Sequence, residues 1–228
     1  MGGKMKGKVK VVFFDYGGVL TPGISETFHA FAEPFQKSRG INPAEHDRAW
    51  KKVKRLASSG KISFGEAQAR TFKALGKTRK DARNWVKHCE RYHLTRAKPY
   101  PGVVETLARL KREGFKTAVL SDSVYSATFK KRILKRWGAR VDAVYCSSEI
   151  GVEKPARKAF QAVLRRFNAK PCEAVFIGHA KDELDGARKL GIKTIAFRPD
   201  KGAHGDFETN DFKKILKIIQ LRDSCSTA

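Results

Sequence analysis

Residues 11–23 read VVFFDYGGVLTPG, and this stretch decides the fold. An apolar run over residues 9–14 ends at a single acid, Asp15, and the chain then meets two glycines, Gly17 and Gly18. A short apolar run that stops at turn residues is typical of a strand buried on both faces of a parallel sheet. The stretch therefore predicts a buried strand with a carboxylate at its carboxyl end.

Length and composition indicate either one globular domain with an insertion or two modest domains. The chain has 228 residues, 41% of them hydrophobic, which is enough for a sizeable core. No apolar stretch is long enough to cross a bilayer, and the opening MGGKMKGKVK lacks the apolar middle of a signal peptide. We expect no membrane partner and a cytoplasmic location.

The charge is strongly basic, with 48 Lys and Arg against 23 Asp and Glu and a formal net charge of +25. Such an excess favours polyanionic or phosphorylated partners. Most of the basic residues are expected on the solvated faces of helices, and no nucleic-acid-binding signature accompanies them, so nucleic-acid binding is permitted but not indicated. The basic segments are Lys4, Lys6, Lys8 and Lys10, followed by residues 51–55, 130–136 and 213–217.

The four cysteines are widely spaced, and we interpret them as buried or free thiols. One pair, Cys89 and His93, has the spacing of half a metal site on a helix, but no second half is visible. The other three are Cys146, Cys172 and Cys225.

A helical segment is expected between residues 25 and 92. Four amphipathic stretches each follow a residue type that caps helix N-termini: Ser25, Asn42, Ser63 and Thr78. The aromatic residues Phe28, Phe35, Trp50 and Trp85 in this segment either form its own core or line a pocket.

After Pro99 and Pro101 the pattern becomes alternating strand and helix. This alternation predicts an α/β fold with a right-handed, doubly wound, parallel sheet. The expected strands cover residues 116–121, 141–147, 173–178 and 193–197, and the expected helices cover residues 103–114, 126–138, 154–168 and 181–191.

Ligands of such sheets bind at the carboxyl ends of the strands, where polar residues are concentrated in this sequence. One such residue alone has an ordinary explanation, because Asp15 or Ser121 could cap a helix and Lys154 could be one more solvated lysine. The residues at these ends are Asp15, then Ser121, Asp122 and Ser123, then Glu153 and Lys154, and finally His179, Asp182, Glu183 and Asp185.

In their order and context, these residues resemble the motifs of the haloacid dehalogenase-like (HAD) superfamily. The four matching segments are FFDYGGVLT (13–21), VLSDS (119–123), GVEKP (151–155) and VFIGHAKDELDGARKLGI (175–192). The first motif is most similar to the branch of sugar-phosphate phosphatases and epoxide-hydrolase N-domains, which often reads FDxG. The resemblance implies a Rossmann-like core over residues 1–21 and 99–228 and an inserted all-helical cap over residues 22–98.

The resemblance also implies a Mg²⁺-dependent phosphatase that acts on a small phosphorylated metabolite. Asp15 would be the nucleophile and would form an aspartyl-phosphate, while Ser121, Asp122 and Lys154 would bind the phosphoryl group. The implied Mg²⁺ ligands are Asp15, the carbonyl of Gly17, and Asp182 or Glu183 from the fourth motif.

Two positions depart from the family pattern. Gly17 replaces the second aspartate of the first motif, which is the usual general acid and base. His179 replaces the acid that normally follows the glycine of the fourth motif. We favour His179 as a neutral residue that weakens the metal site, over a replacement proton shuttle.

Two other functions stay open. One is a metal-independent hydrolase of the 2-haloacid dehalogenase type, which the missing fourth-motif acid favours. The other is a non-catalytic protein that uses a degenerate pocket and its basic surface to bind an anionic ligand or nucleic acid. The sequence predicts neither the substrate nor the oligomeric state.

Overall fold

Strand β1 (Val11–Phe14) lies inside a six-stranded sheet with the order β3-β2-β1-β4-β5-β6. The computed structural model describes residues 9–22 and 26–224 of the chain. All strand pairs are parallel, which confirms the predicted α/β fold with a parallel sheet. The other strands are β2 (Lys116–Ser121), β3 (Ala143–Cys146), β4 (Ala174–Gly178), β5 (Lys193–Phe197) and β6 (Phe207–Thr209).

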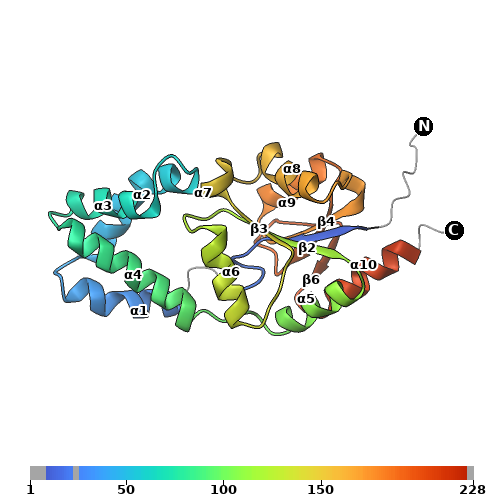
Figure 1. Ribbon diagram of the computed structural model, residues 1–228, viewed down its shortest axis with the longest axis horizontal. Helices are drawn as coiled ribbons and strands as arrows, with labels where there is room; N and C mark the ends of the chain where they lie inside the picture. Colours follow the sequence, from blue (N-terminus) through green and yellow to red (C-terminus); the bar gives the residue numbers. More distant parts are fainter. Residues whose placement is uncertain (1–8, 23–25, 225–228) are drawn as a thin grey trace.

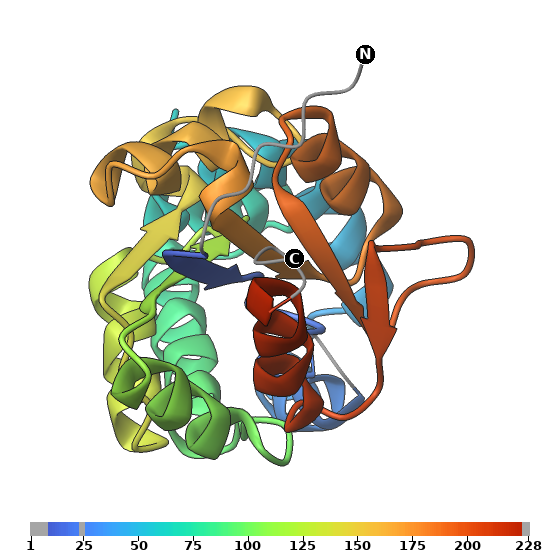
Figure 2. The same cartoon turned by 90° about the vertical axis from the view of Figure 1, so that its right-hand side faces the viewer.

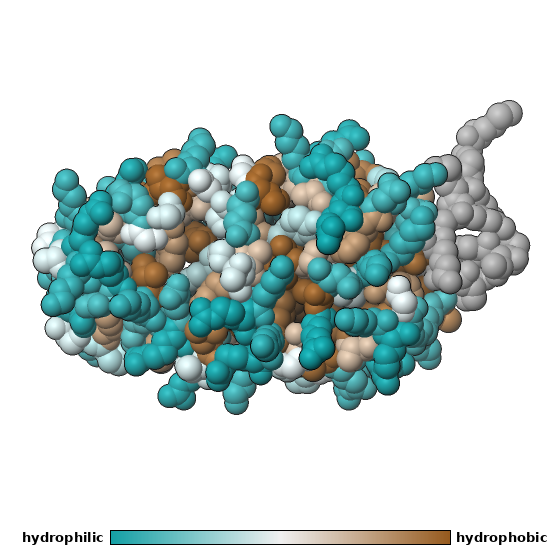
Figure 3. Space-filling model, viewed as in Figure 1, coloured by the Kyte–Doolittle hydropathy of each residue, from teal (hydrophilic) through white to brown (hydrophobic). Residues whose placement is uncertain are grey.

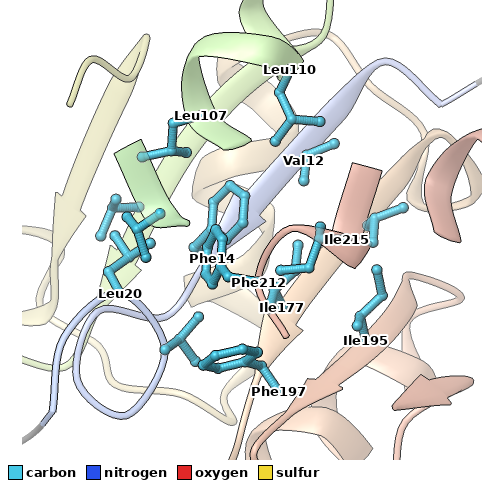
Figure 4. Packing of buried hydrophobic residues seen from close by; sticks show 14 of the residues in the cluster. Val12, Phe14, Leu20, Leu107, Leu110, Ile177, Ile195, Phe197, Phe212 and Ile215 are labelled. Atoms are coloured by element: carbon cyan, nitrogen blue, oxygen red, sulfur yellow. The ribbon is translucent and has the colours of Figure 1, made fainter. Parts of the chain in front are cut away.

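Helices cover both faces of the sheet, and successive residues of β1 point to opposite faces (Figure 2). Val12 and Phe14 pack with helices α5 (Val103–Arg112) and α10 (Lys214–Ser224), and Phe14 also stacks on Phe212, which precedes α10 (Figure 4). Val11 and Phe13 face α8 (Arg157–Arg166) and α9 (Lys181–Lys189) instead. These four side chains are fully buried, each contributing about 1.5 to 3 kcal/mol. The uninterrupted apolar run in β1 follows from this burial on two faces.

The sequence predicts one of the next two helices, α6, but not the other, α7. Helix α6 (Ala127–Arg136) begins after Ser126, whose hydroxyl accepts a hydrogen bond from the Phe129 amide, as its expected span implies. Residues 141–147 were expected as one strand, but α7 (Ser147–Ile150) begins at Ser147. The Ser147 hydroxyl accepts a hydrogen bond from the Ser123 amide at 2.9 Å, so this residue supports the loop after β2 rather than extending β3.

Four helices lie between β1 and α5 and form the helical cap at one end of the molecule (Figure 1). Three of the expected N-caps are confirmed: Asn42, Ser63 and Thr78 each accept hydrogen bonds from the first turn that follows. Ser25, the fourth, lies outside the described residues, and the boundaries at residues 22 and 98 stay a prediction. The cap helices are α1 (Glu26–Lys37), α2 (Pro43–Ser58), α3 (Phe64–Ala74) and α4 (Arg79–Thr95).

The chain enters and leaves the cap through two segments that are bonded to each other. The Thr21 hydroxyl donates to the Lys98 carbonyl at 2.7 Å, and the Tyr100 amide donates to the Leu20 carbonyl at 2.9 Å. Because Leu20 and Thr21 follow the β1 loop directly, these bonds hold the cap beside the carboxyl end of β1.

The interior of the cap is aromatic and contains histidine. Phe28, Phe35 and Trp85 belong to this core, whereas Trp50 lines a cavity described below. Cys89 is a free, buried thiol of the same core, as expected, and Cys225 lies outside the described residues.

Outside these cores the surface is polar. Hydrophilic side chains cover most of the face shown in Figure 3, with apolar areas that are small and scattered. In the described part of the chain, no helix combines the length and the apolar character needed to span a membrane.

His93 connects the cap to the core, and we predict that it makes stability depend on pH. Its ring lies 5.0 Å from that of Tyr125, and burial, with the nearby charge of Lys130 as a second cause, lowers the pKa of His93 to about 4. The unfolded chain binds a proton below its ordinary pKa of 6.5, which the folded chain excludes. The free energy of unfolding should therefore fall by roughly 2 to 3 kcal/mol as the pH drops from about 6.5 to about 4.

Urea unfolding at several pH values measures this loss. His93→Phe should keep the ring contacts and flatten the pH dependence, whereas His204→Gln, which changes an exposed histidine, should leave it as in the wild type. Equal slopes for the wild type and His93→Phe would contradict the prediction.

Candidate active site

Asp15 stands at the carboxyl end of β1. One of the two glycines that follow it, Gly18, is explained by its backbone conformation and by the His179 ring beside it. The Asp15 amide donates to the Ile177 carbonyl at 2.9 Å, which continues the β1–β4 pairing up to the acid. Gly18 has a φ of +77°, and a Cβ at this position would come within 2.6 Å of the His179 ring. Only glycine suits both the turn and this close approach.

Lys154 is buried and meets three carboxylates. Its ammonium donates to Asp15 Oδ1 at 2.6 Å and to the Leu120 carbonyl at 3.1 Å. It also forms ion pairs with Glu183 Oε1 at 3.3 Å and with Asp122 Oδ2 at 3.6 Å. We call Asp15, Asp122, Lys154 and Glu183 the carboxylate–lysine cluster.

Two backbone features bring Lys154 to this position. Its amide donates to Asp122 Oδ1 at 3.0 Å, so one aspartate holds both the main chain and the side chain of the lysine. Pro155 packs against α9 at Gly186, where a Cβ would stand 2.7 Å from Pro155 Cβ. A larger residue at 186 would push the Lys154 loop away from the carboxylates.

One ammonium cannot neutralise three carboxylates, and the pKa values reflect this. Burial alone would lower the pKa of Lys154, but Asp15, Glu183 and Asp122 raise it above its ordinary value. Burial raises the pKa of Glu183 to about 7, against the lowering effect of Lys154. Burial likewise raises the pKa of Asp122. The three carboxylates thus favour the charged form of Lys154, whereas burial disfavours the ionised form of Glu183.

His179 lies on the other side of Asp15. Its Nε2 is 3.7 Å from Asp15 Oδ2, and its Nδ1 is 3.2 Å from Asp200 Oδ1. The Asp200 amide also donates to the His179 carbonyl at 3.0 Å. Asp200, in the loop after β5, was not anticipated, and no sequence signal distinguishes it from other acids in loops.

The structure brings together most of the predicted site residues, but not Asp182. Ser121 is buried and lines a cavity together with Asp122 and Gly17. Asp182 is exposed, and its carboxylate accepts a hydrogen bond from the Glu183 amide instead of facing Asp15. Asp185 pairs with Lys181 and Arg188, away from the cluster.

The oxygen donors around Asp15 fit a Mg²⁺ ion only in part. In favour, Glu183 Oε2 is buried and has no hydrogen-bond partner in the described part of the chain, so this acceptor is available to a cation. Against, His179 holds the position expected for an acid, and residues 9–22 and 26–224 contain no group of three or more His, Cys, Asp or Glu side chains that could hold a metal. Mg²⁺ often takes only one or two carboxylates and completes its shell with water and phosphate, so the two carboxylates Asp15 and Glu183 are compatible with this ion.

A cavity of about 470 Å³ separates this end of the sheet from the cap. That volume suits a small metabolite. Its core wall includes Tyr16, Gly17, Ser121 and Asp122, and its cap wall includes Trp50, Lys54, Tyr92 and Arg96.

Lys130 also lines this cavity, and its interpretation as a solvated residue of a basic segment is wrong. It is only 6% exposed, and its ammonium lies 3.4 Å from the centre of the Tyr16 ring. A signal was available, because Lys130 lies on the buried face of α6 with Ile133 and Leu134, at i+3 and i+4. A lysine on an apolar stripe is a candidate for a buried role.

Comparisons with known proteins place this geometry in a family. A glyceraldehyde 3-phosphate phosphatase from Pyrococcus furiosus is 32% identical over 136 residues, which cover 57% of this chain and 57% of that protein. A second one, from Methanothermobacter thermautotrophicus, is 27% identical over 202 residues, covering 82% of this chain and 84% of that protein. The chain thus spans little more than half the length of the first of these relatives.

A structural comparison and a family comparison agree with the similarity to these phosphatases. The crystal structure of a 2-haloacid dehalogenase from Pseudomonas syringae pv. tomato DC3000 superposes with a TM-score of 0.75 at 16% identity, covering 94% of this chain and 99% of that one, which shows a common fold. The expected branch within the superfamily stays a prediction. The model of the haloacid dehalogenase-like hydrolases matches residues 9–191, most of the chain, and the protein therefore belongs to that family of hydrolases.

Proposed function

We propose that the protein is a phosphatase that transfers the phosphoryl group of a small phosphate monoester to Asp15 and then to water. The observation that carries this proposal is the position of Asp15, hydrogen-bonded to a buried lysine beside a cavity of metabolite size. The phosphatase names of the relatives from Pyrococcus and Methanothermobacter support the reaction type.

The side chains divide the first chemical step between them. A carboxylate oxygen of Asp15 attacks phosphorus and forms an acyl phosphate, while the P–O bond to the alcohol breaks and the alcohol oxygen takes up a proton from solvent water. The Lys154 ammonium and the Ser121 hydroxyl stabilise the charge on the phosphoryl oxygens. Water then attacks the acyl phosphate, which regenerates Asp15 and releases inorganic phosphate.

Magnesium would bind at Asp15, Glu183 and the Gly17 carbonyl, and would supply further positive charge beside the phosphoryl oxygens. The buried, unpartnered Glu183 Oε2 supports this assignment. Asp182 is not part of the proposed set, because its carboxylate is exposed.

Gly17 is expected to lower the rate of phosphate ester hydrolysis. With no carboxylate two residues after Asp15, no side chain in that position can protonate the leaving alcohol. A missing general acid typically lowers the rate about 10²- to 10⁴-fold, so we propose a slow enzyme or one that prefers good leaving groups.

We predict that Asp15→Asn abolishes turnover, because an amide cannot form the acyl phosphate. Hydrolysis of p-nitrophenyl phosphate should fall roughly 10³-fold or more. Asp47→Asn, which changes an exposed acid of the cap that pairs with Lys51, should retain the wild-type rate. Undiminished turnover by Asp15→Asn would refute the assignment of the nucleophile.

We further predict that His179→Asp strengthens magnesium binding. The substitution puts a carboxylate on the side of Asp15 where the His179 ring now lies, with its Nε2 at 3.7 Å from Asp15 Oδ2, and it leaves Gly18 free of the ring. Affinity for Mg²⁺, measured by calorimetry, should rise roughly tenfold, with His204→Gln as an unchanged control.

The same measurements test the second candidate, a metal-independent hydrolase of the dehalogenase type. The observation that favours it is the His179 ring beside Asp15. Wild-type phosphatase activity that requires Mg²⁺ would eliminate that candidate, whereas activity that survives EDTA, with no gain of affinity in His179→Asp, would eliminate the magnesium assignment.

A further inference from the structure

The cavity contains more positive charge than one phosphoryl group requires. Lys154 is already paired with three carboxylates, yet four other cations line the cavity. None of the four forms an ion pair with any residue in the described ranges. These cations are Lys54, Arg96, Lys98 and Lys130.

Lys130 is the most informative of them, because it is buried. An ammonium without an acceptor is costly inside a protein, and the contact with the Tyr16 ring compensates only in part. Burial, although opposed by the charges of Cys146 and Asp15, lowers the pKa of Lys130 to about 8. Such a group is expected where an anion binds.

Tyr16 points to the same conclusion independently. It lines the cavity, and its hydroxyl is buried with no hydrogen-bond partner among the residues that the structure describes. Stacking on Trp137, at 5.9 Å between ring centres, fixes the ring on which the Lys130 ammonium sits. A buried hydroxyl and a buried ammonium side by side offer donors and lack an acceptor.

The remaining cations are on the opposite wall. Lys54 comes from α2, Arg96 ends α4, and Lys98 lies in the segment that returns to the core. They belong to the cap side, whereas Ser121 and Lys154 belong to the core. The positive charge therefore extends across the cavity, away from the groups proposed to bind the phosphoryl oxygens.

We propose that the substrate is a phosphate monoester with a second anionic group, a carboxylate or another phosphate, which binds to Lys130 and Tyr16 under the rim of Lys54, Arg96 and Lys98. This inference rests on the proposed function and specifies its substrate class. Lys130 is then a specificity residue that contacts the non-reacting end of the substrate.

Three esters that share a three-carbon chain test the proposal. They are 3-hydroxypropyl phosphate, 3-(phosphonooxy)propanoate and propane-1,3-diyl bisphosphate, which differ only in the group at the far end. For the wild type we expect kcat/KM to be at least about tenfold higher for one or both anionic esters than for the neutral one, chiefly through a lower KM. The ester with the higher value identifies the second group as carboxylate or phosphate.

Substitutions then assign the preference to a residue. Lys130→Met should lower kcat/KM about tenfold for the preferred anionic ester and change it less than threefold for 3-hydroxypropyl phosphate. Lys131→Met, an exposed neighbour on α6, is the matched control and should leave the ratio unchanged. Arg96→Gln, at an exposed position where folding is not at risk, should reduce the preference about threefold.

The outcomes separate failure of the inference from failure of the proposed function. Equal kcat/KM for all three esters, or an equal loss for all three in Lys130→Met, would overturn the second-anion site; the equal loss would place Lys130 at the phosphoryl group. If neither these esters nor p-nitrophenyl phosphate is hydrolysed, the proposed function fails; if only the three esters are not hydrolysed, the proposed function stands. In both cases calorimetric binding of the same esters to Asp15→Asn decides the inference alone. Binding that does not discriminate between neutral and anionic esters would then overturn it.

Discussion

The site depends on one buried ammonium that faces three carboxylates. Without Lys154, Asp15, Asp122 and Glu183 would repel one another in a poorly solvated space, at a cost of several kcal/mol per uncompensated charge. The lysine thus joins the loops after β1 and β2 to α9, and its hydrogen bond orients the Asp15 carboxylate. Lys154 therefore has two roles: it stabilises the site before the substrate binds, and in the proposed reaction it lies next to phosphorus.

Close backbone approaches make this arrangement possible. Gly18 leaves room for the His179 ring, and Gly186 allows the Pro155 loop to pack on α9. Both glycines act through the absence of a side chain, so each is coupled to a residue of the site that lies elsewhere in the chain. Gly18 is coupled to His179, and Gly186 is coupled to Lys154. The opening motif and the third and fourth motifs therefore form one unit, although more than 130 residues separate the first from the others.

The sequence predicted the parts of the molecule that local patterns encode. Strand β1, the helix caps at Asn42, Ser63 and Thr78, and the meeting of Asp15, Ser121, Lys154 and Glu183 at the strand ends all follow from periodicity or motif order. Asp182 and Glu183 could not be separated in this way. Neighbours on a helix point about 100° apart, so only one of them can face Asp15, and the packing of α9 decides which. Asp200 lies in a loop, and strand β6 has only three residues, so neither shows a hydrophobic periodicity from which it could be predicted.

Charge is distributed unequally between the two walls of the cavity. Part of the excess of basic residues in the sequence therefore lies at the proposed site. The core wall has an excess of carboxylates around Lys154, whereas Lys130 and the cap-side residues Lys54 and Arg96 have no acidic partners in the described chain. A dianionic phosphoryl group must approach the like-charged Asp15, where Lys154 and Ser121 are proposed to compensate its charge. The unpaired cations are then left for the far end of the substrate, so the two ends of one small molecule would meet positive charge from different parts of the cavity wall.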